Sequence, residues 1–114
     1  MRQVLMGDVI AAARVLLADD PPHRPVLLGR MIHQAEQADH YRKRLGRNHP
    51  DWGNGSLMAA AGVWPQAPEP FLSDPDYLDC LDMVLVRLAL RRCRRKPVFS
   101  SCRSFQMKTV DYLV

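Results

Sequence analysis

Apolar residues recur along much of the chain at steps of three and four, which is the spacing of one helix face. The first stripe predicts a helix over residues 2–18. Asp19-Asp20-Pro21-Pro22 ends it, because proline cannot continue the helical hydrogen-bond ladder. The second stripe predicts a helix that begins within residues 22–25 and extends to Leu45, and Gly46 follows as a left-handed cap.

The second half of the chain predicts one short helix and one long helix. Residues 56–63 are rich in Leu, Met and Ala, and Trp64-Pro65 stops them. Ser73-Asp74-Pro75-Asp76 is the clearest helix start, since Ser or Asp caps a first turn that tolerates proline. The helix that it opens extends to about Arg95, and the periodicity lapses from Pro97.

The fold class expected from these elements is all-α: a small bundle of three long helices plus one short helix. We expect a single helical domain over residues 1–96 and an irregular or partly disordered tail over residues 97–114. A length of 114 residues fits one domain. No apolar run reaches the roughly 18 residues of a membrane span. Arg14 interrupts the apolar stretch near the N-terminus, which argues against a signal peptide.

The cysteines and the charge distribution refine this picture. Cys80, Cys93 and Cys102 are odd in number and form no C-x-x-C pair, which argues against a disulfide scaffold or zinc knuckle and favours reduced thiols in a cytosol. Residues 1–86 carry 8 Lys/Arg and 11 Asp/Glu, whereas residues 87–114 carry 8 Lys/Arg and 1 acid. The basic end therefore predicts contact with something acidic.

Most of this positive charge lies at the end of the last predicted helix. The basic patch consists of Arg87, Arg91, Arg92, Arg94, Arg95 and Lys96. It suits phosphates, an acidic protein surface or anionic lipid, and the alternative is a solvated helix end favoured by the helix dipole. No helix-turn-helix or aromatic-interleaved RNA motif accompanies it, so only sequence-nonspecific nucleic-acid binding is a candidate.

The connection between the second helix and the short helix is dense in turn formers and carries a tryptophan and a histidine. Its candidate binding residues are Arg44, Arg47, His49, Trp52, Asn54 and Ser56. An exposed Trp52 beside Arg47 and His49 would resemble a binding hot spot, although we favour packing of its large surface. Gly53-Asn54-Gly55-Ser56 can direct backbone N–H groups at an anion, but it lacks the spacing and the lysine of a phosphate loop, and a structural turn is favoured.

A metal site has one weak indication in the sequence. His33, Glu36 and His40 share one helical face and are metal-ligand residue types. A site there needs a further protein ligand, and the sequence indicates none. We favour a polar helix face, and we expect no metal, no cofactor and no catalytic residue.

Three segments of the chain are similar to a known group of proteins. Residues 1–17, the block Tyr41-Arg42-Lys43-Arg44-Leu45-Gly46-Arg47-Asn48-His49-Pro50-Asp51-Trp52-Gly53-Asn54-Gly55-Ser56-Leu57-Met58, and residues 69–77 resemble an uncharacterised small domain-of-unknown-function family of Rhodobacter-type alphaproteobacteria. The resemblance covers roughly residues 1–90. It implies a bacterial cytoplasmic setting and brings no activity, cofactor or catalytic residue. From about Cys93 the chain departs from the family pattern, in which the chain stops soon after the last helix.

Three hypotheses of function follow from these observations. The first is a non-enzymatic protein-interaction or adaptor module that uses the Arg44–Ser56 loop, with Trp52 as its anchor and a partner of unknown identity. The alternative is an electrostatic, sequence-nonspecific nucleic-acid-binding accessory that uses residues 87–96. The least favoured is a small enzyme or metal protein built on four side chains, namely His33, Glu36, His40 and His49.

Overall fold

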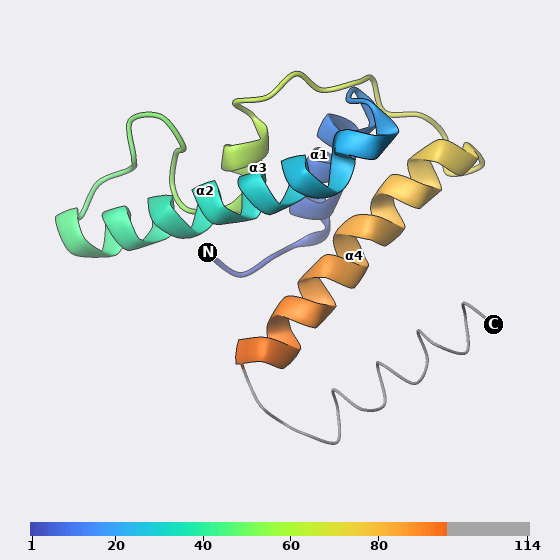
Figure 1. Cartoon of the computed structure of the whole chain (residues 1–114). Coiled ribbons are helices and arrows are strands. Elements are labelled where there is room, and N and C mark those ends of the chain that lie inside the picture. The colour runs from blue at the N-terminus through green and yellow to red at the C-terminus, as the bar shows by residue number, and fades with distance from the viewer. Residues whose placement is uncertain (96–114) are drawn as a thin grey trace. The chain divides into compact units, whose positions relative to one another are not determined.

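The structure, a computed structural model, describes residues 1–95 and the side chains of residues 1–92 (Figure 1). Its elements are α1 (Met6–Leu17), the 3-10 turn η1 (Pro21–His23), α2 (Arg24–Leu45), α3 (Leu57–Ala61) and α4 (Pro75–Arg95). The described residues are helical with no strand, and three of the four α-helices are long, so the expected all-α class is confirmed. The tail expected over residues 97–114 lies outside the described residues.

The chain divides into two compact units, Met1–Val84 and Leu85–Val114. The first unit contains α1, α2, α3 and the beginning of α4, and it holds the loop singled out by the sequence. The second unit begins within α4, and its described part is the remainder of that helix. The expected single domain over residues 1–96 stays a prediction.

Most helix ends follow the local signals in the sequence, although α3 ends at Ala61 and not at the expected Val63. Gly46 takes the left-handed conformation, with φ of 71°, just past the end of α2. The Asp74 carboxylate accepts the backbone N–H groups of Asp76 (2.9 Å) and Tyr77 (3.3 Å), and so caps α4. The expectation that the first helix starts at about Arg2 is wrong, because α1 begins at Met6.

The late start of α1 has a physical cause in two hydrogen bonds. The Asp8 carboxylate accepts the Leu5 backbone N–H at 2.7 Å, which ends the helical ladder there as in a capping box. Further towards the N-terminus, the Arg2 backbone N–H donates to the Gly55 carbonyl at 2.9 Å. Asp8 also accepts the backbone N–H of Met58 at 2.9 Å, so one carboxylate serves the first turns of α1 and α3.

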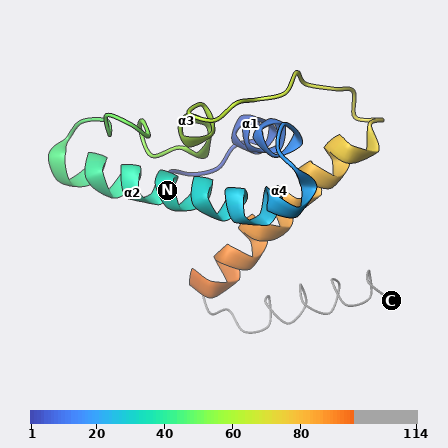
Figure 2. The ribbon, with the colours of Figure 1, turned by 45° about the horizontal axis from the view of Figure 1, so that its top comes forward.

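The core of the first unit lies where α1 and α3 pack together over α2 (Figure 2). Alanines on α1 and α3 let these helices approach closely, and larger side chains come from α2. The residues with no exposed surface include Ala12, Ala13, Leu16, Leu28, Met31, Ala35, Leu57, Ala60 and Ala61. The first turns of α4 add Tyr77, Cys80 and Val84, of which the most exposed is 2% accessible. Cys80 is thus a buried core residue, and burial raises the pKa of its thiol.

The proline-containing connection between α3 and α4 is tied down along its length. Arg14 Nε donates to the Ala67 carbonyl at 2.8 Å, and the Ala67 N–H donates back to the Arg14 carbonyl at 3.1 Å. Trp64 Nε1 donates to Gln34 Oε1 at 3.2 Å. Arg14, the charged residue that interrupts the apolar stripe of α1, therefore holds the segment around Ala67 in place.

Arg24 joins three elements at the beginning of α2. Its residue surface is 5% exposed, and its Nε donates to the Leu16 carbonyl at 2.7 Å, near the end of α1. Its two terminal nitrogens donate to the two oxygens of Asp76 at 2.8 and 3.2 Å, in the first turn of α4. The hydrogen bond from Arg24 lowers the pKa of Asp76, and the same bond raises the pKa of Arg24.

We predict that Arg24→Lys destabilises the chain by on the order of 2 kcal/mol, because an ammonium cannot supply the planar fork that serves Leu16 and Asp76 together. Urea unfolding followed by circular dichroism measures this difference. Arg30→Lys is the matched control, since Arg30 is an exposed arginine on the same helix. Equal stability of the two variants would show that the fork of Arg24 is dispensable.

Candidate functional site

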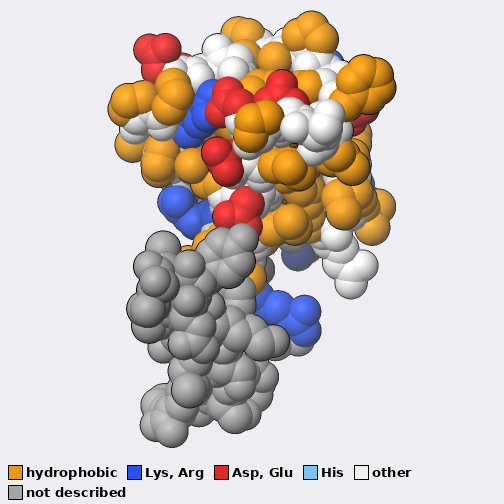
Figure 3. Space-filling model, turned by 90° about the vertical axis from the view of Figure 1, so that its right-hand side faces the viewer, with side chains coloured by type: hydrophobic (Ala, Val, Ile, Leu, Met, Phe, Trp, Pro, Cys, Tyr) orange, Lys and Arg blue, Asp and Glu red, His pale blue; other side chains and the backbone are white. Residues whose placement is uncertain are grey.

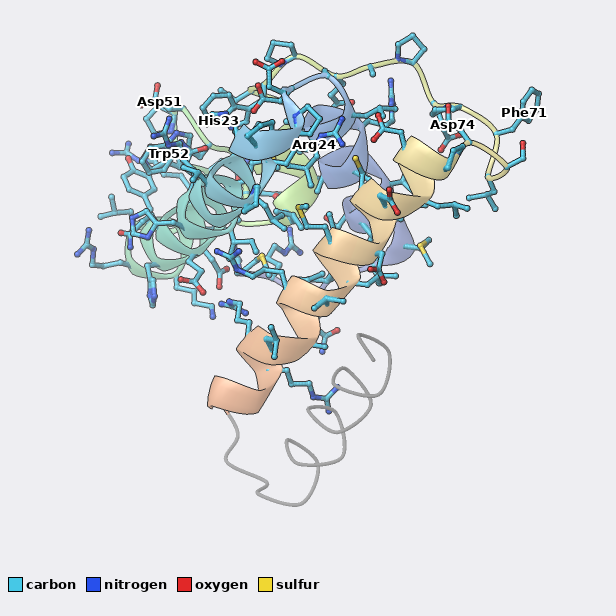
Figure 4. The ribbon with its side chains drawn as sticks, turned by 45° about the vertical axis from the view of Figure 1, so that its right-hand side comes forward. His23, Arg24, Asp51, Trp52, Phe71 and Asp74 are labelled. Atoms are coloured by element: carbon cyan, nitrogen blue, oxygen red, sulfur yellow. The ribbon has the colours of Figure 1, made fainter. Side chains whose placement is uncertain are left out.

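The loop between α2 and α3 closes on itself through backbone hydrogen bonds. The His49 N–H donates to the Gly53 carbonyl at 2.9 Å, and the Gly53 N–H donates to the His49 carbonyl at 3.1 Å. These two bonds enclose Pro50, Asp51 and Trp52 in a tight turn. Trp52 therefore sits at a defined place on a short closed loop, and Figure 4 labels it beside Asp51.

His49 organises the side chains of this turn. Its Nδ1 accepts the backbone N–H groups of Asp51 at 3.0 Å and of Trp52 at 3.2 Å. Its ring lies parallel to the Trp52 ring, with centroids 4.5 Å apart and an interplanar angle of 6°. Tyr41, on α2, meets the same imidazole edge-on at a centroid distance of 4.9 Å. We call Tyr41, His49 and Trp52 the aromatic cluster.

Asn54 and Ser56 use their side chains to shape the end of the loop. Asn54 Oδ1 accepts the Ser56 N–H at 3.0 Å, which forms an Asx turn. Ser56 Oγ accepts the Ala59 N–H at 3.1 Å and caps α3. Both of these candidate binding residues thus hold the loop in place.

Gly55 fixes the loop against α2. A Cβ atom at Gly55 would lie 2.7 Å from the Cα and the Cβ of Asp39, and the backbone of Gly55 has φ of 92°. Neither condition suits a residue with a side chain. The end of the loop therefore crosses α2 in direct backbone contact.

Asp39 is a buried carboxylate beneath this crossing, with 5% of its side chain exposed. It pairs with the Met1 ammonium (3.2 Å), Arg42 (3.0 Å) and Lys43 (3.0 Å). Burial alone would raise the pKa of Asp39, but the hydrogen bonds from Lys43, Arg42 and Met1 outweigh it and hold that pKa well below its usual range. One carboxylate thus meets three cations.

A groove with a volume of about 690 Å³ runs along the loop, which we call the loop groove. The aromatic cluster forms part of its lining. Its other lining residues are Gln37, His40, Lys43 and Arg44. Trp52 is partly buried there, whereas Lys43 and Arg44 are exposed. The groove therefore combines a rigid aromatic wall with unburied positive charge, and the exposed Arg47 follows close by in the chain.

A second groove of about 790 Å³ lies beside Met1, and Lys43 lines both grooves. Its acidic groups are Asp8 and Asp39, which already accept the hydrogen bonds described above. This groove surrounds the interactions that hold the N-terminal segment in place. We take the loop groove as the candidate site.

The remaining candidates from the sequence are the proposed metal ligands and the basic patch, and the structure places them in different parts of the chain. Of the proposed metal ligands, His33 is exposed, and His40 lines the loop groove with His49. Among the residues that the structure describes, no three His, Cys, Asp or Glu side chains are arranged to hold a metal ion. In the basic patch Arg87 and Arg92 are exposed and Arg91 is partly buried. The side chains of Arg94, Arg95 and Lys96 lie outside the described residues.

Sequence reasoning missed two contributors to the site. Tyr41 is not among the candidate binding residues of the sequence, yet it lies near the end of α2 and its ring contacts His49. Asp39 has a local signal only for its pairing with Arg42 and Lys43, whereas its partner Met1 and its neighbour Gly55 are distant in sequence.

The fold and site define a small all-α bundle domain with a closed aromatic loop. A family model described as "Domain of unknown function (DUF7742)" matches residues 2–88, which is most of the chain, and the chain belongs to this family. No curated protein and no solved structure matches the chain. Within residues 1–95, no helix combines the length and apolar character needed to cross a membrane.

We predict that Gly55→Ala destabilises the fold by about 2 kcal/mol more than Gly46→Ala. Both residues have positive φ, at 92° and 71°, so both substitutions carry the left-handed penalty of roughly 1 kcal/mol. Only Gly55 adds a backbone clash with Asp39, because nothing lies within 4 Å of a Cβ at Gly46. Chemical unfolding of the two variants measures the difference, and equal losses would contradict the close crossing.

We predict that Asp39→Asn costs on the order of 3 kcal/mol at neutral pH, because it removes the buried negative charge that pairs with the Met1 ammonium, Arg42 and Lys43. The stability that Asp39 contributes is complete above the unfolded pKa of about 4 and falls away as the pH drops further, since its folded pKa is lowered. Thermal unfolding measured from neutral pH down to about pH 2 should therefore show that the difference in Tm between the unchanged chain and Asp39→Asn shrinks as the pH falls. A gap that stays constant would show that the ionised carboxylate is not the stabilising form.

Proposed function

We propose that this chain is a non-enzymatic protein-interaction module, and that the loop groove binds an acidic, apolar-tipped segment of its partner. The observation that carries the proposal is the stack of Trp52 on His49 in the wall of a groove that also exposes Lys43 and Arg44. Aromatic residues and arginine are the residue types enriched at the centres of protein interfaces.

Rigidity supports this function. Backbone bonds between His49 and Gly53 close the turn, and His49 Nδ1 holds the N–H groups of Asp51 and Trp52. A partner that contacts Trp52 therefore meets a ring that is already in place, which reduces the entropy lost on binding.

The charge balance favours an acidic partner. Residues 40–52 contain four Lys/Arg and a single acid, the exposed Asp51. The nearest carboxylate on α2, Asp39, is buried and engaged by three cations. Arg44 lines the groove and is exposed, and the exposed Arg47 follows three residues later. Complementary charge in a partner raises specificity and the association rate.

The same geometry favours binding over catalysis. One ring nitrogen of His49 is occupied by two backbone N–H groups, so this histidine serves the conformation of the loop. We propose a bacterial cytoplasmic setting, of the alphaproteobacterial kind that the resemblance implies.

We predict that Trp52→Ala weakens the affinity for the partner at least about tenfold, as expected at a hot spot, and leaves the helical circular-dichroism spectrum intact. Arg44→Glu should weaken binding in the same way and make it less sensitive to salt. Capture with the full chain and mass spectrometry identifies the partner, and titration calorimetry of the purified pair gives the affinities.

Val63→Ala is the matched control, because Val63 is 54% exposed and does not line the groove. Affinity that survives both Trp52→Ala and Arg44→Glu in folded protein would overturn the proposal. Recovery of nucleic acid that is lost on removal of residues 91–114 would instead favour the basic patch as the binding surface, and it would also overturn the proposal.

A further inference from the structure

Two large apolar side chains stand exposed at the far end of the connection that leads into α4. Phe71 is 87% exposed and Leu72 is 65% exposed. They lie on a turn that the Asp74 N–H closes by donating to the Phe71 carbonyl at 3.0 Å. Figure 4 labels Phe71 at the outer edge of the connection. Singly exposed apolar residues are common, whereas apolar side chains that are exposed side by side add to a contiguous apolar patch, the kind of surface that marks interaction sites when it is large.

This segment, residues 69–74, which we call the arm, is held in a defined conformation. The Tyr77 hydroxyl donates to Glu69 Oε1 at 3.4 Å, at the beginning of the arm. At its end the Asp74 carboxylate caps α4. Pro70 within the arm restricts the backbone further. The apolar tip is thus presented without the entropy cost of ordering a flexible loop.

The surroundings of the arm are acidic. Residues 69–82 contain five Asp/Glu and no Lys or Arg. Asp76 is paired with Arg24, while Glu69, Asp79 and Asp82 are exposed. Figure 3 shows hydrophobic side chains interleaved with acidic ones on the face it displays. The arm therefore has the chemistry that the loop groove requires of a partner, an apolar tip flanked by carboxylates.

The arm cannot occupy the groove of its own molecule. Arg24, which holds the first turn of α4, lies at the beginning of α2, and Tyr41 of the aromatic cluster lies near its end. These residues are 17 positions apart on one helix, a separation of about 25 Å at 1.5 Å per residue. Figure 4 accordingly shows the labelled Phe71 and Trp52 at opposite ends of the view.

We infer that the arm of one copy of this chain binds the loop groove of a second copy. Phe71 and Leu72 enter the groove against the aromatic cluster, and the carboxylates around the arm face Arg44 and Arg47. The contact joins two unlike surfaces, so every copy carries one arm and one groove. This inference rests on the proposed function, because it names the partner of the same groove.

Sedimentation velocity of the full chain over a range of concentrations tests the inference. The average mass should rise with concentration at low salt, and the association should weaken about tenfold or more at roughly 0.5 M salt, where surface charges are screened. Phe71→Ser and the double variant Arg44→Glu/Arg47→Glu should each remain monomeric under the same conditions. Val63→Ser is the matched control for an exposed apolar residue elsewhere and should associate as the unchanged chain does.

Mixing the two monomeric variants gives the sharpest result. The Phe71→Ser protein keeps an intact groove, and the Arg44→Glu/Arg47→Glu protein keeps an intact arm. An equimolar mixture should therefore regain one contact and form a complex of one copy of each. Circular dichroism of each variant beforehand ensures that a monomeric result reflects a lost contact in a folded protein.

Three outcomes would overturn the inference: a chain that stays monomeric at all concentrations, association that survives Phe71→Ser, or variants that fail to combine on mixing. None of these touches the proposed function itself. That proposal fails only if capture of a different partner is independent of Trp52 and Arg44 or depends on residues 91–114.

Discussion

The arrangement of the first unit depends on the buried carboxylate of Asp39. It draws the Met1 ammonium, Arg42 and Lys43 to one point, and the backbone of Gly55 crosses directly above it. An isolated charge buried this deeply is costly, so its three partners are a condition of its burial. These contacts of Asp39 hold the N-terminal segment, the end of α2 and the loop together. The shape of the loop groove depends on them.

Arg24 has the corresponding role at the other end of α2. Its guanidinium uses the Leu16 carbonyl and the Asp76 carboxylate at once, which ties the end of α1 and the beginning of α4 to the same helix. Arg24 at the beginning of α2 and Asp39 in its second half thus hold different neighbouring segments against the same helix. The basic groove and the acidic arm are kept apart by this helix, and the separation makes a contact between copies geometrically available.

Local signals in the sequence were sufficient for most of the fold. Gly46 and Asp74 mark helix ends through their own backbone preferences, and the structure bears both out. The start of α1 was predicted too early because the apolar stripe already includes Leu5. The helix begins at Met6 because Asp8 accepts the Leu5 N–H and because Arg2 bonds to the loop at Gly55. The Arg24–Asp76 and Asp39–Met1 pairs were not predictable from a single sequence, since no pattern links either pair and Arg24 and Asp76 lie 52 residues apart. Only the Arg42 and Lys43 partners of Asp39 lie at local helical spacing. Within the loop, Trp52 and His49 could be selected as candidates from the local sequence. The contact of Tyr41 with His49 could be seen only in the folded structure.

The hydrogen bonds of His49 also determine which hydrogen-bonding groups the loop can offer. Because Nδ1 accepts two backbone N–H groups, the proton of the neutral imidazole resides on Nε2. The ring keeps this tautomer for as long as the turn is closed, and its other ring nitrogen is then a donor. An incoming carboxylate or carbonyl oxygen can satisfy that donor, whereas a guanidinium or ammonium group finds no acceptor on the ring. At the proposed interface, the imidazole thus supplies a hydrogen-bond donor for oxygen-bearing groups.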